Sequence, residues 1–287
     1  CKCVAIERIW IFEGKTGKTF PKEKELFVQE LKKAFKLDSK LNSKTSLAIS
    51  LAGDGSLLSM IRNMDEKRFD IPVLGVHTSE GLGFLHRLAL PKKAAQSTQL
   101  FKVWMKNFIE MLKTESFHLQ NRWGVEASLN RHHLCWGMND LVMSKGALSR
   151  MVCLKVKVDG SLLFAKLRGD GLIIASPTGS TAYSLAAGGP IVVPGLDGIL
   201  ITPILPHEIA QRPLVISSNS SIQIEVLDGP PCYLTEDGQR TTEVKAGQSF
   251  AIQKSSKPIR WLEPDMEGVR DYCLLYTSPS PRDQRGS

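Results

Sequence analysis

The chain has 287 residues, of which 42% are hydrophobic, and this length allows one large or two ordinary domains with well-formed cores. No apolar run approaches the 18 residues of a membrane-spanning helix, so we expect no membrane partner. The formal net charge of +8 comes partly from the lysines between Lys15 and Lys44. No stripe of interleaved aromatic residues and no recognised binding motif accompanies them, so we interpret them as a solvated helix face and expect no nucleic-acid partner.

The first 115 residues alternate apolar strands with amphipathic helices. We expect strands at Val4–Phe12, Ser46–Leu51 and Ile71–Val76, and helices at Lys22–Phe35, Gly55–Met64 and Pro91–Leu112. Such alternation is typical of a parallel sheet covered by helices. The sequence therefore predicts an α/β domain with a parallel sheet and flanking helices over residues 1–115.

From about residue 116 the pattern changes to short runs with a period of two. In Val152–Val158 the polar Lys155 and Lys157 alternate with apolar residues, which is typical of a half-exposed strand. Short runs of this kind, separated by turns, indicate stacked antiparallel sheets. We therefore predict an all-β, sandwich-like domain over residues 116–272.

Both ends of the chain look unlike natural termini. The first residue is Cys1 rather than Met, so we expect the natural start, and any targeting peptide, to be missing. Residues 273–287 are rich in Ser, Pro and Arg, have no apolar periodicity, and resemble translated adapter or cloning sequence. We expect them to be a non-native, disordered tail.

The cysteines give no sign of a metal or disulfide framework. They stand at positions 1, 3, 135, 153, 232 and 273, without the spacing of a zinc site. A chain of this size does not need disulfides for stability. We therefore expect reduced thiols and a cytoplasmic location, and we assign no metal-ligating residue.

The most informative segment runs from Gly169 to Pro190. The apolar run Leu172–Ala175 is followed by Thr178–Ser184, in which five of seven residues carry a hydroxyl group. We expect a loop that surrounds a polar ligand with small hydrogen-bonding groups. A plain surface turn is the alternative, but the Asp170 upstream and the glycine pair downstream make it a poor explanation.

A second Gly-Asp-Gly triplet lies earlier, in Ala52-Gly53-Asp54-Gly55-Ser56, between two apolar runs. The pattern predicts strand, glycine turn and helix, where backbone N–H groups and the helix N-terminus favour a phosphate. It is neither a Walker loop nor G-x-G-x-x-G. Taken alone, Gly-Asp-Gly is more often an ordinary structural turn.

Together these motifs resemble the NAD kinase family. The chain shows its strand–turn–helix at Ala52–Ser56, its mid-chain pair at Asn139–Asp140, and its hydroxyl-rich segment at Pro177–Ser184, in the family's order and spacing. Pro203–His207 leading to Arg212–Val215 matches as well. The resemblance covers most of the chain and implies the same two-domain fold.

The resemblance also implies an activity. Members are kinases that transfer a phosphoryl group from ATP to the 2′-hydroxyl of the adenosine ribose of NAD, producing NADP. We accordingly expect ATP and NAD as substrates, a divalent metal such as Mg²⁺ as cofactor, and a homo-oligomer, dimeric or tetrameric.

The first triplet supplies the expected catalytic residue. By resemblance Asp54 is the general base toward the 2′-hydroxyl, since a carboxylate can accept the hydroxyl proton. Gly53, Gly55 and Ser56 would present backbone and hydroxyl donors to phosphate. Ala52 replaces the family's usual first glycine, which implies a modest local adjustment. The alternative role for Asp54 is that of an Asx-turn residue.

Further binding residues follow from the same match. Asn139 and Asp140 correspond to the pair that binds ribose and amide groups, although an ordinary strand-edge turn would also suit them. Asp170 would hold nicotinamide or ribose. The other matched positions are Phe84, Arg150, Arg168, Thr181, Ala182, Tyr183, Ser184, Ala186 and Gln239.

Some of these positions keep a second interpretation. Tyr183 is expected to stack on a base, but it would serve equally as a core tyrosine. Arg150 and Arg168 could reach phosphates or remain solvated charges. Phe84 would line the nucleotide site, although the approach to it is one residue longer than usual.

Two other classes of protein remain open. Lipid kinases of the diacylglycerol and sphingosine type share the first triplet. Their acceptor pocket is apolar, however, and the hydroxyl-rich segment argues against such a pocket here. A non-catalytic dinucleotide-binding protein with the same fold is the other alternative. The intact Asp54, Asn139, Asp140 and Asp170 argue against it.

Overall fold

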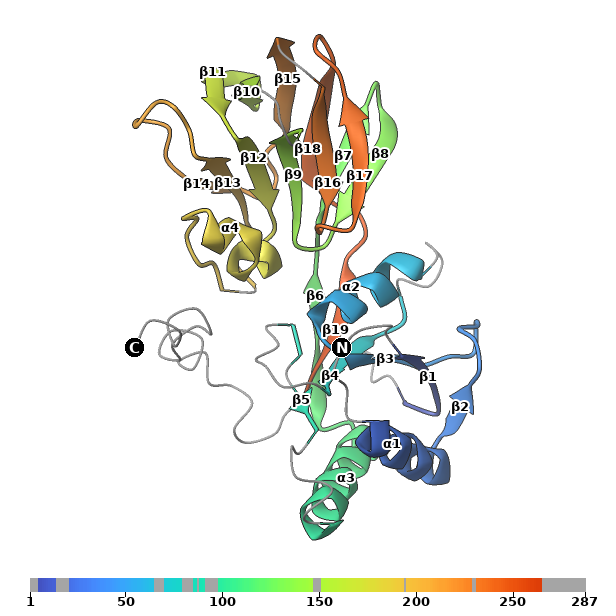
Figure 1. Ribbon diagram of the computed structural model, residues 1–287. Coiled ribbons are helices and arrows are strands. Elements are labelled where there is room, and N and C mark those ends of the chain that lie inside the picture. The colour runs from blue at the N-terminus through green and yellow to red at the C-terminus, as the bar shows by residue number, and fades with distance from the viewer. Residues whose placement is uncertain are drawn as a thin grey trace, which may run out of the picture. The chain divides into compact units, whose positions relative to one another are not determined.

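The computed structural model describes residues 5–13, 21–64, 70–78, 85–86, 88–90, 98–146, 151–193, 195–228 and 231–264. Contacts along the chain group it into two compact units. The first contains residues 1–64, 71–119 and 261–287, and the second contains residues 65–70 and 120–260. Figure 1 labels the elements of both units and colours them by residue number.

The first unit is built on a largely parallel sheet with the strand order β2-β1-β3-β4-β19-β6, in which β5 also pairs with β4. Its strands are β1 (Arg8–Glu13), β2 (Lys36–Asp38), β3 (Leu47–Ala52), β4 (Val73–His77), β5 (Leu88–Ala89), β6 (Phe117–Arg122) and β19 (Ile259–Pro264). Its helices are α1 (Pro21–Ala34), α2 (Asp54–Asn63) and α3 (Thr98–Lys113). The predicted α/β architecture is confirmed.

Apolar packing explains why this unit forms. Every residue of β3 is buried, as expected for the middle strand of a parallel sheet covered on both faces. Helices α1 and α3 pack together through aromatic rings: the centroids of Phe27 and Phe108 lie 5.5 Å apart, and Trp104 stacks on Phe108 at 5.2 Å. These rings close one side of the core.

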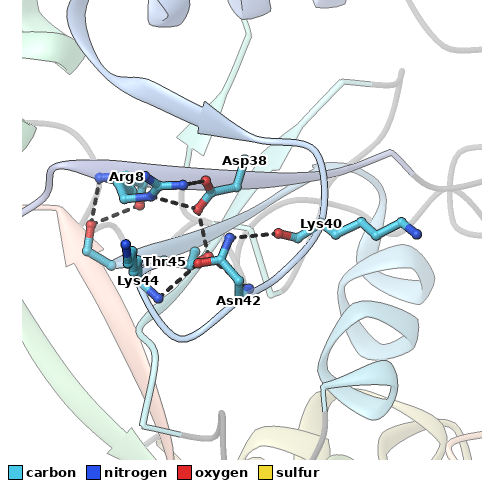
Figure 2. Close-up of polar contacts among 7 residues, drawn as sticks. Arg8, Asp38, Lys40, Asn42, Lys44 and Thr45 are labelled. Atoms are coloured by element: carbon cyan, nitrogen blue, oxygen red, sulfur yellow. Dashed lines mark hydrogen bonds and ion pairs between the residues drawn. The ribbon is translucent and has the colours of Figure 1, made fainter.

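A polar cluster holds the edge strand β2 against β1 (Figure 2). Arg8 forms an ion pair with Asp38, and the Thr45 hydroxyl donates to the same carboxylate at 2.8 Å. The Ser46 hydroxyl donates to the Arg8 carbonyl at 2.8 Å. Burial would raise the pKa of Asp38, but the Arg8 and Thr45 hydrogen bonds and the Arg8 charge together lower it. The cluster stabilises the sheet edge and contains no predicted site residue.

In the described part of the second unit, two antiparallel sheets form a sandwich. One has the order β11-β10-β15-β18-β7-β8 and the other β14-β13-β12-β9-β16-β17. The strands are β7 (Val125–Leu129), β8 (His132–Gly137), β9 (Asp140–Lys145), β10 (Val152–Val158), β11 (Ser161–Gly169), β12 (Gly171–Ala175), β13 (Gly198–Ile204), β14 (Leu214–Ser217), β15 (Ile222–Asp228), β16 (Cys232–Glu236), β17 (Arg240–Val244) and β18 (Ser249–Lys254).

Alternating side chains of both sheets share one core. Leu154 and Ile224 of the first sheet join Met143 and Ile174 of the second in a single buried cluster. The Val152–Val158 strand begins and ends where the period of two predicted. This confirms the predicted sandwich-like fold.

The last described strand belongs to a different unit from the one predicted. We expected residues 116–272 to form one continuous β-rich domain, but Trp261 in β19 pairs with Val73 and lies in the first unit. The reason is that the Trp261 side chain is fully buried there, which a short β run in the sequence does not reveal. The expected tail, 273–287, lies outside the described residues.

The hydroxyl-rich segment is also more regular than the expected loop. Thr178–Thr181 form a 3₁₀ turn, η2, and Tyr183–Ala186 form the short helix α4. Backbone bonds of the helical type, such as Ala182 N–H to the Gly179 carbonyl at 3.0 Å, hold it together. Among the described helices, none is both long and apolar enough to cross a membrane.

Candidate active site

The first triplet forms the predicted strand–turn–helix. Strand β3 ends at Ala52, Gly53 is the N-cap of α2, and α2 begins at Asp54. A Cβ built on Gly53 would meet no atom within 4 Å, so the turn borders open space. Gly55 is exposed, whereas Ser56 is buried and donates its N–H to the Gly53 carbonyl at 2.9 Å. The turn therefore exposes backbone at a helix N-terminus, where an anion is favoured.

Asp54 is held by partners that the sequence analysis missed. Its Oδ1 lies 2.7 Å from Nδ1 of His86 and accepts the Leu85 N–H at 3.2 Å. The His86 side chain is fully buried, whereas that of Asp54 is 28% exposed. The signal lay in the sequence, because Leu85 and His86 directly follow the loop in which Phe84 was predicted to matter.

In the second unit, Asn139 directly precedes β9 and Asp140 is the first residue of that strand. The carboxylate of Asp237, in the turn between β16 and β17, accepts the N–H groups of Met138, Asn139 and Asp140 at 3.1, 2.8 and 3.2 Å. In return, the Asp237 N–H donates to the Asp140 carbonyl at 3.1 Å. The pair thus belongs to a fixed connection rather than a loose turn.

A second set of contacts fixes Asn139 from the side of the hydroxyl-rich segment. The Ser176 N–H donates to the Asn139 carbonyl at 2.9 Å, and the Ser176 hydroxyl donates to the Met138 carbonyl at 2.7 Å. A Cβ on Gly179 would lie 2.0 Å from the Asn139 carbonyl oxygen. Gly179 is therefore required for this close backbone approach.

The Asn139 side chain retains an unused acceptor. Its Oδ1 is buried and has no hydrogen-bond partner among the described residues. A buried amide oxygen without a partner is costly, at roughly 1–3 kcal/mol, unless a bound molecule donates to it. This observation favours a ligand-binding role over the ordinary turn that the sequence left open.

Asp140 is unusual in its protonation. Burial, with the nearby charge of Asp237, raises the pKa of Asp140 to about 7. Its side chain is almost completely buried, at 3% exposure. Near neutral pH it can therefore either donate a hydrogen bond as the acid or accept bonds as the carboxylate.

Thr181, Ala182 and Tyr183 lie on the same segment as Gly179, beside Asn139. Tyr183 is 48% exposed, which excludes the core tyrosine left open by the sequence. Ala186 is exposed as well. The remaining matched residue of α4, Ser184, is buried, and its hydroxyl bonds Thr202 at 2.9 Å within the unit.

Asp170 and Arg168 lie away from Asn139 and Asp140. In the β9–β12 register Asp140 pairs with Ala175, whereas Gly171 pairs with Ser144 at the other end. At about 3.3 Å per residue, these ends are roughly 13 Å apart. Asp170 forms an ion pair with Lys145 at 2.6 Å, and Arg168 is exposed on β11.

The structure gives less information on the other predicted site residues. Gln239 is exposed in the β16–β17 turn, two residues beyond Asp237. Phe84 and Arg150 lie outside the described residues. Next to Thr178, a cavity of about 380 Å³ is lined by polar residues that include Arg122 and Lys254.

Comparisons with known proteins agree with this fold. Residues 138–263 match the family model for the ATP-NAD kinase C-terminal domain. The NAD kinase of Syntrophotalea carbinolica is 39% identical over 222 residues, covering 76% of this chain and 72% of that protein. The NAD kinase of Polaromonas naphthalenivorans is 35% identical over 228 residues, covering 78% of this chain and 73% of that protein.

Solved structures share the fold. The crystal structure of yeast NADH kinase complexed with NADH has a TM-score of 0.77 and 22% identity, and the match covers 96% of this chain and 89% of that one. The family model and these relatives define a kinase of the ATP-NAD type. The chain belongs to the NAD kinase family.

Proposed function

We propose that the chain transfers the γ-phosphoryl group of ATP to the 2′-hydroxyl of the adenosine ribose of NAD, producing NADP. Family membership supports the proposal. The local observation that carries it is the Asp54 carboxylate, which is partly exposed at the start of α2, directly after the open turn at Gly53.

In the proposed reaction Asp54 accepts the proton of the 2′-hydroxyl. The hydroxyl oxygen forms a bond to the γ-phosphorus, the bond from that phosphorus to the β,γ-bridging oxygen breaks, and ADP leaves with that oxygen. A general base of this kind contributes about 10²- to 10⁴-fold in rate. Gly53, Gly55 and the backbone of Ser56 bind phosphate at the start of α2.

The acceptor residues belong to the second unit. Asn139 and Asp140 bind ribose hydroxyl and amide groups of NAD, for which the unpartnered Asn139 Oδ1 is one acceptor. Thr181, Ala182 and Tyr183 form a wall beside the dinucleotide, and the exposed ring of Tyr183 can stack on a base. Asp170 is proposed to hold nicotinamide or ribose, and Arg168 and Gln239 are proposed to contact other parts of the ligand. The roles of Phe84 and Arg150 stay predictions.

The divalent metal, proposed as Mg²⁺, arrives with the substrate as the magnesium complex of ATP. No group of three His, Cys, Asp or Glu side chains converges among the described residues. Mg²⁺ is commonly bound by one or two carboxylates plus substrate phosphates rather than by a protein cage. Bound this way, it neutralises charge on the phosphate oxygens.

A cytoplasmic location and a homo-oligomeric state complete the proposal. Cys135 and Cys153 are buried and form no disulfide, as suits a reducing compartment. Burial, with the charge of Glu236, raises the pKa of Cys135 to about 12, so that thiol stays protonated and unreactive. Sedimentation of the purified protein tests the oligomeric state.

A coupled assay tests the activity. Purified protein is incubated with NAD, ATP and Mg²⁺, and NADP is detected with a dehydrogenase that accepts only NADP. We expect signal that requires all three additions. Folded protein that binds NAD but gives no NADP would instead indicate a non-catalytic dinucleotide-binding protein. Phosphorylation of diacylglycerol or sphingosine in its place would indicate a lipid kinase.

A further inference from the structure

His86 is the least expected group near the proposed site, because it is an ionisable side chain with no exposed surface. Its Nδ1 lies 2.7 Å from Asp54 Oδ1. Since a carboxylate oxygen can only accept, Nδ1 must carry the proton. Together with the Leu85 N–H at 3.2 Å, it gives Oδ1 two donors from one short segment.

Two described neighbours, Gly75 and His77, pack closely against the His86 ring. Gly75 of β4 lies so close that a Cβ there would be 2.6 Å from the ring carbon Cδ2. The ring of His77 meets that of His86 edge-on, with centroids 5.6 Å apart. A side chain confined in this way holds its hydrogen-bond donor at one place.

Asp54, by contrast, lies in the first turn of α2 with its side chain 28% exposed. We propose that His86 is a positioning residue: its Nδ1–H fixes Oδ1 of Asp54 so that Oδ2 accepts the proton of the substrate hydroxyl. This inference rests on the proposed function. It explains why the buried His86 imidazole faces a carboxylate, since packing alone would not require that orientation.

Substitutions separate positioning from simple packing. His86→Leu keeps an apolar side chain of similar bulk but removes the donor, so kcat should fall about 10- to 100-fold while KM for NAD and ATP changes little. His86→Asn places an amide N–H near the former Nδ1 and should restore kcat to within a few-fold of the parent. In the Asp54→Asn background, His86→Leu should lower kcat little further, because the two residues act as one unit.

His118→Leu is the matched control, because His118 is exposed on β6, and this variant should keep the parent kcat. Melting temperatures identify variants that fail to fold. If His86→Leu does not fold, the comparison of His86→Asn with the parent carries the test. A folded His86→Asn variant with a kcat as low as that of Asp54→Asn would overturn the proposal.

A measurement without turnover keeps this proposal separate from the proposed function. Nitrogen-15 NMR of the imidazole in the parent should show a protonated Nδ1 for His86, and the signal should shift in Asp54→Asn. An unprotonated Nδ1 would overturn the pairing, even in an active enzyme. Absence of NADP formation with a normal Nδ1–H signal would reject the kinase activity but not the contact.

Discussion

At the scale of single residues, the proposed chemistry depends on two carboxylates in different surroundings. Asp54 is partly exposed and hydrogen-bonded to His86. Asp140 is buried next to the charge of Asp237, and the pKa of Asp140 is raised to about 7. Such separation of environments suits one carboxylate to accept a proton and the other to bind polar groups in either protonation state.

Asp54→Asn tests the catalytic carboxylate. The amide preserves the shape of the side chain but cannot take the hydroxyl proton, so kcat should fall about 10²- to 10⁴-fold. Binding of NAD, measured by calorimetry, should change little. Turnover within a few-fold of the parent would contradict the general-base role.

Asp140→Asn tests the raised pKa of Asp140 through stability. The folded state keeps the proton up to about pH 7, whereas the unfolded chain releases it near the usual value of 3.8. Asp140 therefore makes folding less favourable as pH rises through this window, and an amide avoids the loss.

We expect Asn at position 140 to raise stability on the order of 1–3 kcal/mol at pH 8 and much less at pH 4. Melting temperatures of variant and parent without ligand, taken from pH 4 to 8, measure the difference. A difference independent of pH would contradict the shift.

At the scale of elements, the pair Asn139–Asp140 is held between the η2 segment and the β16–β17 turn. Gly179 approaches the Asn139 backbone on one side, and Asp237 accepts three N–H groups on the other. Asp237 has a φ of 47°, a conformation that aspartate tolerates better than most residues. The fold itself therefore holds the proposed binding pair from both sides.

Gly179→Ala should disturb this arrangement. Its Cβ would meet the Asn139 carbonyl oxygen at 2.0 Å, and backbone on both sides would have to move. We expect a loss of about 2–4 kcal/mol in the free energy of unfolding, together with weaker NAD binding. Gly53→Ala is the control for stability, because its Cβ meets nothing within 4 Å. Equal melting temperatures for the two variants would contradict the tight approach.

At the scale of the whole molecule, the chain passes through the β-rich unit and then returns to the first. Strand β19 adds to the sheet next to β4, with Trp261 fully buried. The stability of the N-terminal unit therefore depends on residues near the end of the described chain.

A pair of truncations tests this dependence. Removing residues 261–287 should destabilise the first unit, because its sheet loses a buried strand. Removing residues 274–287 should leave the melting temperature and activity unchanged, since their composition cannot bury an apolar face. Limited proteolysis within residues 21–64 measures the first effect. Unaltered protection after the longer truncation would show that β19 is dispensable.

Periodicity and short motifs predicted the architecture well, because both depend on local chemistry. Alternation of apolar runs indicated the parallel sheet, and the period of two indicated strands such as Val152–Val158. Glycine next to Asp54 predicted the strand–turn–helix. The family resemblance rested on the same local segments.

Long-range packing decided what the sequence left open. His86 is 32 residues from Asp54, and Asp237 is about a hundred from Asn139. The return of Trp261 to the first unit and the separation of Asp170 from Asp140 follow from strand pairing. Such contacts join residues that share no local pattern, so the sequence by itself determined the two fold classes and the candidate chemistry. Only the tertiary structure decided which groups hold that chemistry in place.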